Sequence, residues 1–150
     1  MPEFRLSATA LDPAALRRPW DDTRAGACVL FEGRVRGASD GTAVTVLEYE
    51  AHEALAVAEG GRVLAEALER FGLLDAECVH RTGSLLPGDL AVWVAVNAAH
   101  RGAAFEGCRY VIDEIKARVP LWKKEHYAGA PAVWVEGTIP REPGAPPPGP

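Results

Sequence analysis

The sequence predicts a single α/β domain, because segments with the pattern of strands alternate with segments with the pattern of helices. Two long stretches, 53–71 and 101–118, have apolar residues at helical spacing, and the run LAVWVAVNAA that begins at Leu90 is almost wholly apolar. A chain of 150 residues, 48% of them hydrophobic, is large enough to bury one core without disulfides or metal. We assign 1–138 to this domain. The proline-rich residues 139–150 form a tail with too little apolar surface to order itself.

Charge and cysteine content narrow the class of protein. There are 21 Asp and Glu residues against 16 Lys and Arg, a net charge of -5, which argues against a general binder of nucleic acid or anionic membranes. Cys28, Cys78 and Cys108 are odd in number and lie in apolar sequence, which predicts reduced, buried thiols. The first residues are too polar for a signal peptide, and no apolar run is long enough to span a membrane. A soluble, cytoplasmic protein is expected.

In the first half of the chain, a strand is predicted at 4–8 and a short helix at Asp12-Pro13, where the missing proline N–H costs nothing. Residues 27–35 and 43–50 predict two further strands, and the turn-forming sequence GASDGT between them predicts a hairpin. The helix at 53–71 then ends at Gly72. Gly60-Gly61 within it predicts close packing or a break, because each glycine costs about 1 kcal/mol relative to alanine.

In the second half, strands are predicted at 77–84 and 90–98, joined by a tight turn at Pro87-Gly88. The apolar strand 90–98 is expected to be central and covered on both faces. After His100-Arg101 a second long helix runs to about Arg118, since the residue preceding Pro120 is disfavoured in a helix. A last short strand is predicted at 132–136.

Positive charge gathers in the stretch IKARVPLWKKEHY, residues 115–127. Lys116 projects at the margin of an apolar helix face that comprises Phe105, Cys108, Ile112, Ile115 and Val119. Partial burial lowers the pKa of an amine, and a neutral amine is a nucleophile and a base where an ammonium is neither. A lysine whose amine simply reaches out to water is the alternative.

Lys123 and Lys124 follow the turn at Pro120, with Trp122 as an anchor for the backbone. If one of them points back toward Lys116, the two ammonium groups lower each other's pKa and together bind an anion such as phosphate. Two adjacent lysines on a solvated face are the competing interpretation.

Two further clusters are candidates for anion binding. In FEGRVRG, residues 31–37, Arg34 and Arg36 point the same way on a strand, and Arg36 at the strand end is better placed to clamp a carboxylate or phosphate. An exposed charged strand is the alternative. His100 and Arg101 stand at the start of a helix, where free N–H groups and the helix dipole favour an anion. His100 acting only as a cap is the alternative.

The length of the second helix separates these clusters. Arg101 and Lys116 are 15 residues apart, which corresponds to about 22 Å along a helix. They cannot contact one small ligand within a single chain. If both belong to one anion site, a symmetry mate must supply the second half, so we predict a dimer with composite sites.

Metal and nucleotide chemistry are not expected. The four histidines and three cysteines show none of the spacings that metal sites favour, and neither a Walker loop nor a G-x-S-x-G motif is present. We therefore assign no metal ion and no cofactor to the chain.

The motifs FEGRVRG, LEYEAH, HRTGSLLPGDLAVWV, AAHRGAAFEGCRYVIDEIKARVPLWKKE and WVEG, in this order over about residues 26–137, resemble the MoaE family, the catalytic large subunits of molybdopterin synthase. The resemblance implies an α/β hammerhead fold with an additional small antiparallel β subdomain. It also implies a heterotetramer built on a central homodimer. Each large subunit then binds a ubiquitin-like sulfur carrier whose C-terminal Gly-Gly ends in a thiocarboxylate.

The implied activity is that of a sulfurtransferase in molybdenum cofactor biosynthesis, which converts cyclic pyranopterin monophosphate to the dithiolene of molybdopterin. Carried onto this sequence, Lys116 matches the essential lysine and Lys123 the second catalytic lysine. The substrate-binding positions are matched by Arg36, Lys124, His100 and Arg101, the last two supplied by the neighbouring subunit.

The sequence departs from the family pattern at two places. His52 stands where many relatives have an aromatic residue, and Thr138 follows WVEG where some carry an arginine, a charge for which Arg141 is a possible substitute. Two other functions are compatible with the residues alone. One is a non-catalytic module that docks a ubiquitin-like partner or a phosphorylated ligand, and the other is a homodimer that acts on a phosphorylated metabolite without a carrier.

Overall fold

The computed structural model describes residues 2–17, 22–39 and 41–138, so the predicted tail and Arg141 lie outside the described residues. Within them the order of elements is β1 (Glu3–Ser7), α1 (Pro13–Leu16), β2 (Ala27–Arg34), β3 (Ala38–Ser39), β4 (Thr42–Ala51), α2 (Glu53–Phe71), β5 (Asp75–Arg81), β6 (Gly83–Leu85), β7 (Leu90–Ala98), α3 (Arg101–Arg118), β8 (Leu121–Tyr127) and β9 (Ala130–Thr138).

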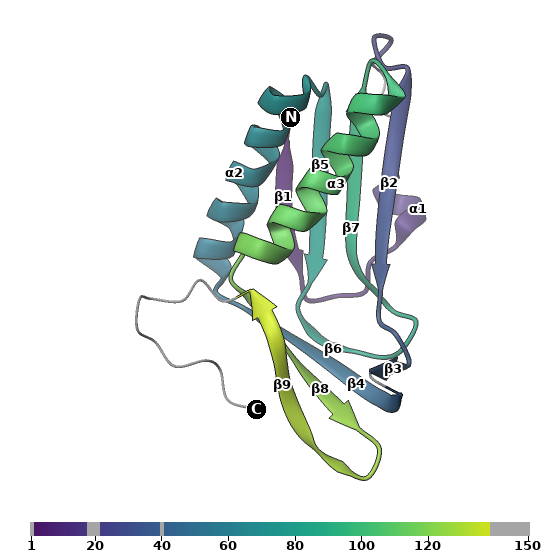
Figure 1. Cartoon of the computed structure of the whole chain (residues 1–150), viewed down its shortest axis with the longest axis vertical. Helices are drawn as coiled ribbons and strands as arrows, with labels where there is room; N and C mark the ends of the chain where they lie inside the picture. Colours follow the sequence, from purple (N-terminus) through teal and green to yellow (C-terminus); the bar gives the residue numbers. More distant parts are fainter. Residues whose placement is uncertain (1, 18–21, 40, 139–150) are drawn as a thin grey trace.

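Two sheets organise the molecule (Figure 1). The first has the strand order β1-β5-β7-β2, and α2 and α3 pack on one of its faces. Only the β1–β5 pair in it is parallel. The second is antiparallel, with the order β3-β4-β8-β9 and with β6 also paired to β4. This arrangement confirms the predicted α/β class with a separate antiparallel sheet.

The main core lies between the four-stranded sheet and the two long helices. All residues of β7 are buried, which confirms the prediction of a central strand covered on both faces. The buried positions of α3 are Ala104, Gly107, Cys108, Val111, Ile112 and Ile115. Each fully buried Val, Leu or Ile side chain contributes about 1.5–3 kcal/mol through the hydrophobic effect, so this packing holds α3 firmly on the sheet.

Helix α2 has the predicted bounds and is unbroken. It ends at Gly72, whose positive φ of 63° permits the left-handed conformation and whose N–H donates to the Leu68 carbonyl. Gly60 lies directly on the ring of Phe4, where a Cβ atom would come within 2.2 Å of Cγ. A Cβ atom added to Gly61 would meet no atom within 4 Å. Close packing, not a break, therefore accounts for the first glycine of the pair.

The predicted hairpin between 27–35 and 43–50 is wrong. Strand β2 pairs with β7 in the first sheet, whereas β4 pairs with β8, β6 and the two-residue β3 in the second. The chain crosses from one sheet to the other between Arg34 and Ala38. Turn-forming residues give the position of a change in direction, but they do not specify which strand becomes the partner.

Two other strand predictions need correction. Strand β8 was not predicted from the sequence, and the predicted strand 77–84 is divided into β5 and β6 on either side of Thr82. Gly83 adopts a φ of 89° there, which allows the chain to leave the first sheet and join the second. The last strand is longer than predicted, Ala130–Thr138.

Two apolar residues are not buried as expected. The buried stripe of α3 is centred on Ala104, Val111 and Ile115, so Phe105 lies outside it with 61% of its surface exposed. Cys28 is exposed because it alternates along β2 with Val29 and Phe31, which pack against the main core, so that it faces an open cavity instead. Cys78 and Cys108 are buried free thiols, as predicted.

The last turn of α3 is tied to α2 by ion pairs. Arg118 donates to Glu59 through Nε at 2.8 Å and to both carboxylate oxygens of Glu66 at 2.5 and 3.0 Å. Tyr110 also donates to Glu66, at 2.9 Å. Paired hydrogen bonds between a guanidinium and a carboxylate are directional, so the bonds of Arg118 fix the part of α3 that carries Lys116.

Candidate functional site

Lys116 lies two residues before the end of α3. This end of the helix lies where the two sheets meet (Figure 1). The helix ends at Arg118, as predicted, and β8 begins after Pro120. Strand β8 then runs back between β4 and β9. This reversal brings β8, the strand that carries Lys123 and Lys124, back past the end of α3.

The period-two alternation of β8 separates its charged residues. Lys123 and Glu125 lie opposite Tyr49 and Leu47 of β4, and all four line one cavity. Lys124, one residue out of phase, lies on the other face of the sheet, with its amine 5.4 Å from the ring centroid of Trp134. The structure therefore brings Lys123, but not Lys124, to Lys116.

The cavity has a volume of about 150 Å³ and four cationic residues in its wall: Arg34, Arg36, Lys116 and Lys123. Among the described residues that line the cavity, Glu125 is the only acidic one. Arg34 is held in place by Glu32, at 2.8 Å, and by the Gly88 carbonyl, at 3.2 Å. Within the described residues Arg36 forms no ion pair. The cavity thus carries an excess of positive charge that suits an anion.

The electrostatics of the cavity act on the amine of Lys116. Loss of hydration lowers the pKa of Lys116, and the neighbouring ammonium of Lys123 lowers it further. The residue as a whole is nevertheless exposed, because the cavity is open to solvent. Both causes were expected from the sequence. They increase the fraction of neutral amine at a given pH, which is the form that can act as a base or nucleophile.

His80 packs edge-on against Tyr49 of the cavity wall and stays uncharged. It is 4% exposed, and its Nδ1 lies 2.7 Å from the Arg81 carbonyl. Burial lowers the pKa of His80 to about 4, and the charge of Lys116 adds to this effect. A neutral imidazole at this position adds no further positive charge to the surroundings of Lys116.

His100 and Arg101 lie at the opposite end of α3 from Lys116. His100 occupies the N-cap position but makes no side-chain capping hydrogen bond. Both Arg101 and Lys116 belong to one continuous helix, so the separation of about 22 Å holds. Within one chain, neither His100 nor Arg101 lines the cavity around Lys116.

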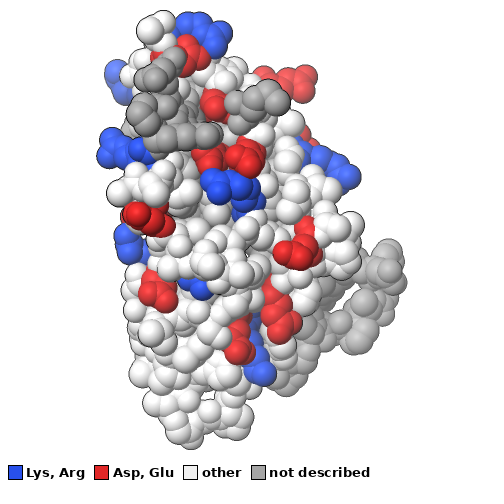
Figure 2. All heavy atoms as spheres, turned by 180° about the vertical axis from the view of Figure 1, so that it is seen from behind, with Lys and Arg blue, Asp and Glu red and all other residues white. Residues whose placement is uncertain are grey.

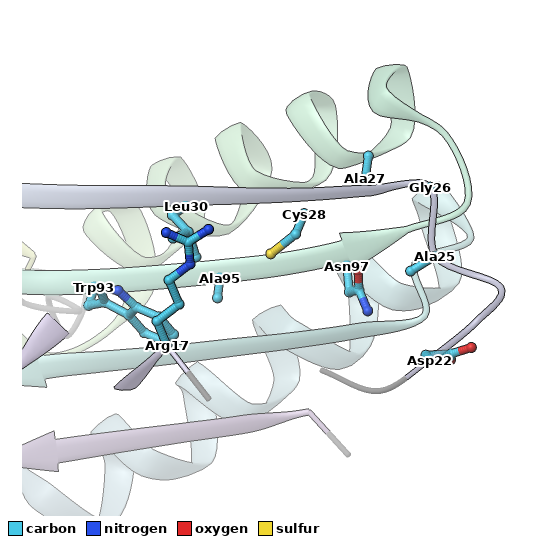
Figure 3. Close-up of a pocket in the computed structure, with 10 residues that line it drawn as sticks. All are labelled: Arg17, Asp22, Ala25, Gly26, Ala27, Cys28, Leu30, Trp93, Ala95 and Asn97. Carbon is cyan, nitrogen blue, oxygen red and sulfur yellow. The ribbon is translucent and has the colours of Figure 1, made fainter. Parts of the chain in front are cut away.

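A larger cavity, of about 470 Å³, contains none of the predicted site residues (Figure 3). It lies against β2 and β7, and its wall includes Arg17, Cys28, Trp93 and Asn97. From behind, Lys and Arg side chains are interspersed with Asp and Glu (Figure 2), so this face presents no continuous basic patch. The smaller cavity is the better candidate, because the cations and the perturbed amine meet there.

Arg34, Tyr49 and Glu125 are among the cavity residues that were not chosen as site residues from the sequence. Arg34 was recognised as pointing the same way as Arg36. Glu125 is two residues after Lys123, so the strand period would have placed it beside that lysine had β8 been predicted. Tyr49 has no such local signal, since only the pairing of β4 with β8 brings it to the site.

The described residues contain no group of three or more His, Cys, Asp or Glu side chains that could hold a metal ion. In the same part of the chain, no helix has both the length and the apolar character needed to cross a membrane.

Comparison with known proteins decides the family. A profile of the MoaE protein family matches residues 6–118. The chain belongs to the MoaE family. A relative of this MoaE chain, the molybdopterin synthase catalytic subunit of Thermoplasma volcanium, is 43% identical over 119 residues, which cover 79% of this chain and 84% of that protein.

Solved structures agree with this MoaE assignment. The crystal structure of molybdopterin synthase from Staphylococcus aureus matches with a TM-score of 0.79 and 32% identity, over 89% of this chain and 96% of that one. A complex of subunits 1 and 2 of the molybdopterin-converting factor from Helicobacter pylori matches with a TM-score of 0.73 over 91% of this chain and 93% of that one. At 22% identity, the second structure supports the fold alone.

Proposed function

We propose that this MoaE-family chain is the catalytic subunit of a molybdopterin synthase. It transfers sulfur from the thiocarboxylate of a ubiquitin-like carrier to cyclic pyranopterin monophosphate and so forms the dithiolene of molybdopterin. The observation that carries the proposal is the meeting of Lys116 and Lys123 in one cationic cavity, where the pKa of Lys116 is lowered. The cytoplasmic location stays a prediction.

The roles follow from the chemistry of each residue. Lys116, as a neutral amine, is the base or nucleophile, and Lys123 is the second catalytic lysine that also favours the neutral form of Lys116. Arg36, assisted by Arg34, binds an anionic group, because a planar guanidinium matches the geometry of carboxylate and phosphate. Lys124 can take part in substrate binding only if the substrate also reaches the face of β8 opposite the cavity.

The size of the cavity supports a composite site. Pockets that enclose a small organic ligand typically measure about 300–1,000 Å³. The cavity of about 150 Å³ has room for a phosphate group or a narrow peptide end, but the fused rings of a pyranopterin need additional walls. We propose that a second copy of the chain supplies them together with its own His100 and Arg101, within a heterotetramer that contains two carriers.

The test is an assay of dithiolene formation from the cyclic pterin precursor and a thiocarboxylated carrier. Lys116→Ala is expected to lose nearly all activity while still binding the carrier. Lys116→Arg is expected to be equally inactive, because a guanidinium stays protonated at all relevant pH values. Arg62→Ala, which removes an exposed cation on α2, serves as the control and should remain active.

The same assay separates the competing functions. A docking module would show no turnover in any variant. Its binding of the partner would tolerate Lys116→Arg, since the positive charge is kept. A homodimer acting alone would give product without the carrier. Turnover of Lys116→Ala at the rate of the unaltered protein would remove the catalytic role of Lys116.

A further inference from the structure

Of the described residues in the wall of the cationic cavity, Tyr49 is the one aromatic. It lies on β4 directly opposite Lys123 of β8, so the two side chains rise side by side on the same face of the sheet. Leu47 and Glu125 form the next pair on this face. The pairing of the two strands therefore sets a phenol among four cations and one carboxylate.

The hydroxyl of Tyr49 is available to a ligand. Within the described residues it makes no hydrogen bond, although the side chain is half-buried. Burial raises the pKa of Tyr49, and the neighbouring Glu125 raises it further, so the phenol keeps its proton. A protonated phenol that lacks a protein partner has a donor to offer to a ligand oxygen.

The position of this hydroxyl is restrained by packing. The ring of Tyr49 stands edge-on to His80, with centroids 4.9 Å apart and an interplanar angle of 76°. His80 is itself buried and held by the Arg81 carbonyl. The Tyr49 ring thus rests on a rigid surface, which reduces the conformational entropy lost when a ligand binds.

We propose that Tyr49 is a further ligand-binding residue of this site, whose hydroxyl donates a hydrogen bond to an oxygen of the anion that Lys116, Lys123 and Arg36 attract. This inference rests on the proposed function. A phenol adds a directional donor without adding charge, whereas a fifth cation would increase the repulsion among those present. The oxygen belongs either to the phosphate of the pterin or to the acyl end of the carrier.

Two binding measurements on the full chain distinguish these sources. The probes are inorganic phosphate and a peptide that ends in a Gly-Gly carboxylate. In Tyr49→Phe, the dissociation constant of one probe is expected to rise about tenfold, as for loss of a hydrogen bond to a charged group. A change for phosphate alone assigns the oxygen to the pterin, and a change for the peptide alone assigns it to the carrier.

Tyr110→Phe is the matched control, because its hydroxyl bonds to Glu66 between the two helices and does not line the cavity. Both dissociation constants should be unchanged in this variant. Unaltered binding of both probes by Tyr49→Phe, or no binding of either probe by the unaltered protein, would overturn the inference. Since neither measurement involves turnover, these results are separate from the Lys116 assay, which alone tests sulfur transfer.

Discussion

At the scale of the residue, the amine of Lys116 is the group on which the proposed chemistry depends. An ordinary lysine is almost wholly protonated near neutral pH, and an ammonium has no lone pair with which to accept a proton or attack a carbonyl. The cavity moves this equilibrium by two means, partial burial and the charge of Lys123. Raising the pH through the lowered pKa increases the neutral fraction, so activity should rise with pH over that range.

The contribution of Lys123 is separable by substitution. We predict that Lys123→Met raises the pKa of Lys116 toward its usual value of 10.5, because the nearest like charge is removed. Lys124→Met should leave the pKa of Lys116 unchanged, since Lys124 lies on the other face of β8. The measurement is a pH titration by NMR of protein labelled in its three lysines. A Lys116 signal that titrates identically in all three proteins would contradict the proposed coupling.

At the scale of the element, α2 offers a matched pair of adjacent glycines. Replacing either by alanine favours the helix by about 0.5–1 kcal/mol. At Gly61 nothing opposes this gain, so Gly61→Ala should stabilise the protein by that amount. At Gly60 the new methyl group meets the Phe4 ring, and overpacking of this kind costs about 1–3 kcal/mol.

Gly60→Ala is therefore predicted to lower the free energy of unfolding, in contrast to its neighbour. Urea denaturation of the two variants beside the unaltered protein measures both effects from the transition midpoints. Equal stabilisation by both substitutions would show that β1 can move away from α2 without loss. It would also show that Gly60 is not required for close packing.

The elements that the sequence predicts well are those with strong local patterns. Helices α2 and α3 have sustained apolar spacing and clear stop signals at Gly72 and Pro120, and β7 is apolar throughout. Strand β8 has no such pattern, because LWKKEHY owes its extended form to pairing on both sides with β4 and β9. Tyr49 reaches the site only through this non-local pairing, so it could not be chosen in advance. Lys116, Lys123 and Arg36 could be chosen because their charge and spacing are visible in the sequence.

At the scale of the whole molecule, the cavity and the start of α3 are two separate cationic regions on one rigid helix. The packing of α3 against the sheet and the Arg118 network leave no hinge between them. No bending within a subunit can therefore bring Arg101 to Lys116. Two copies related by a two-fold axis, with their α3 helices antiparallel, would place Arg101 of each beside Lys116 of the other, which gives two equivalent sites per dimer.

Mixing two inactive variants tests this arrangement. Lys116→Ala and Arg101→Ala subunits, mixed and allowed to exchange, form some dimers in which one site carries both substitutions and the other carries neither. With random exchange, about half of the dimers are mixed and each holds one intact site, so roughly a quarter of full activity should return. Each variant alone, treated in the same way, controls for activity gained by handling. If mass spectrometry confirms exchange and activity stays absent, then Arg101 acts within its own subunit or not at all, and the composite site is wrong.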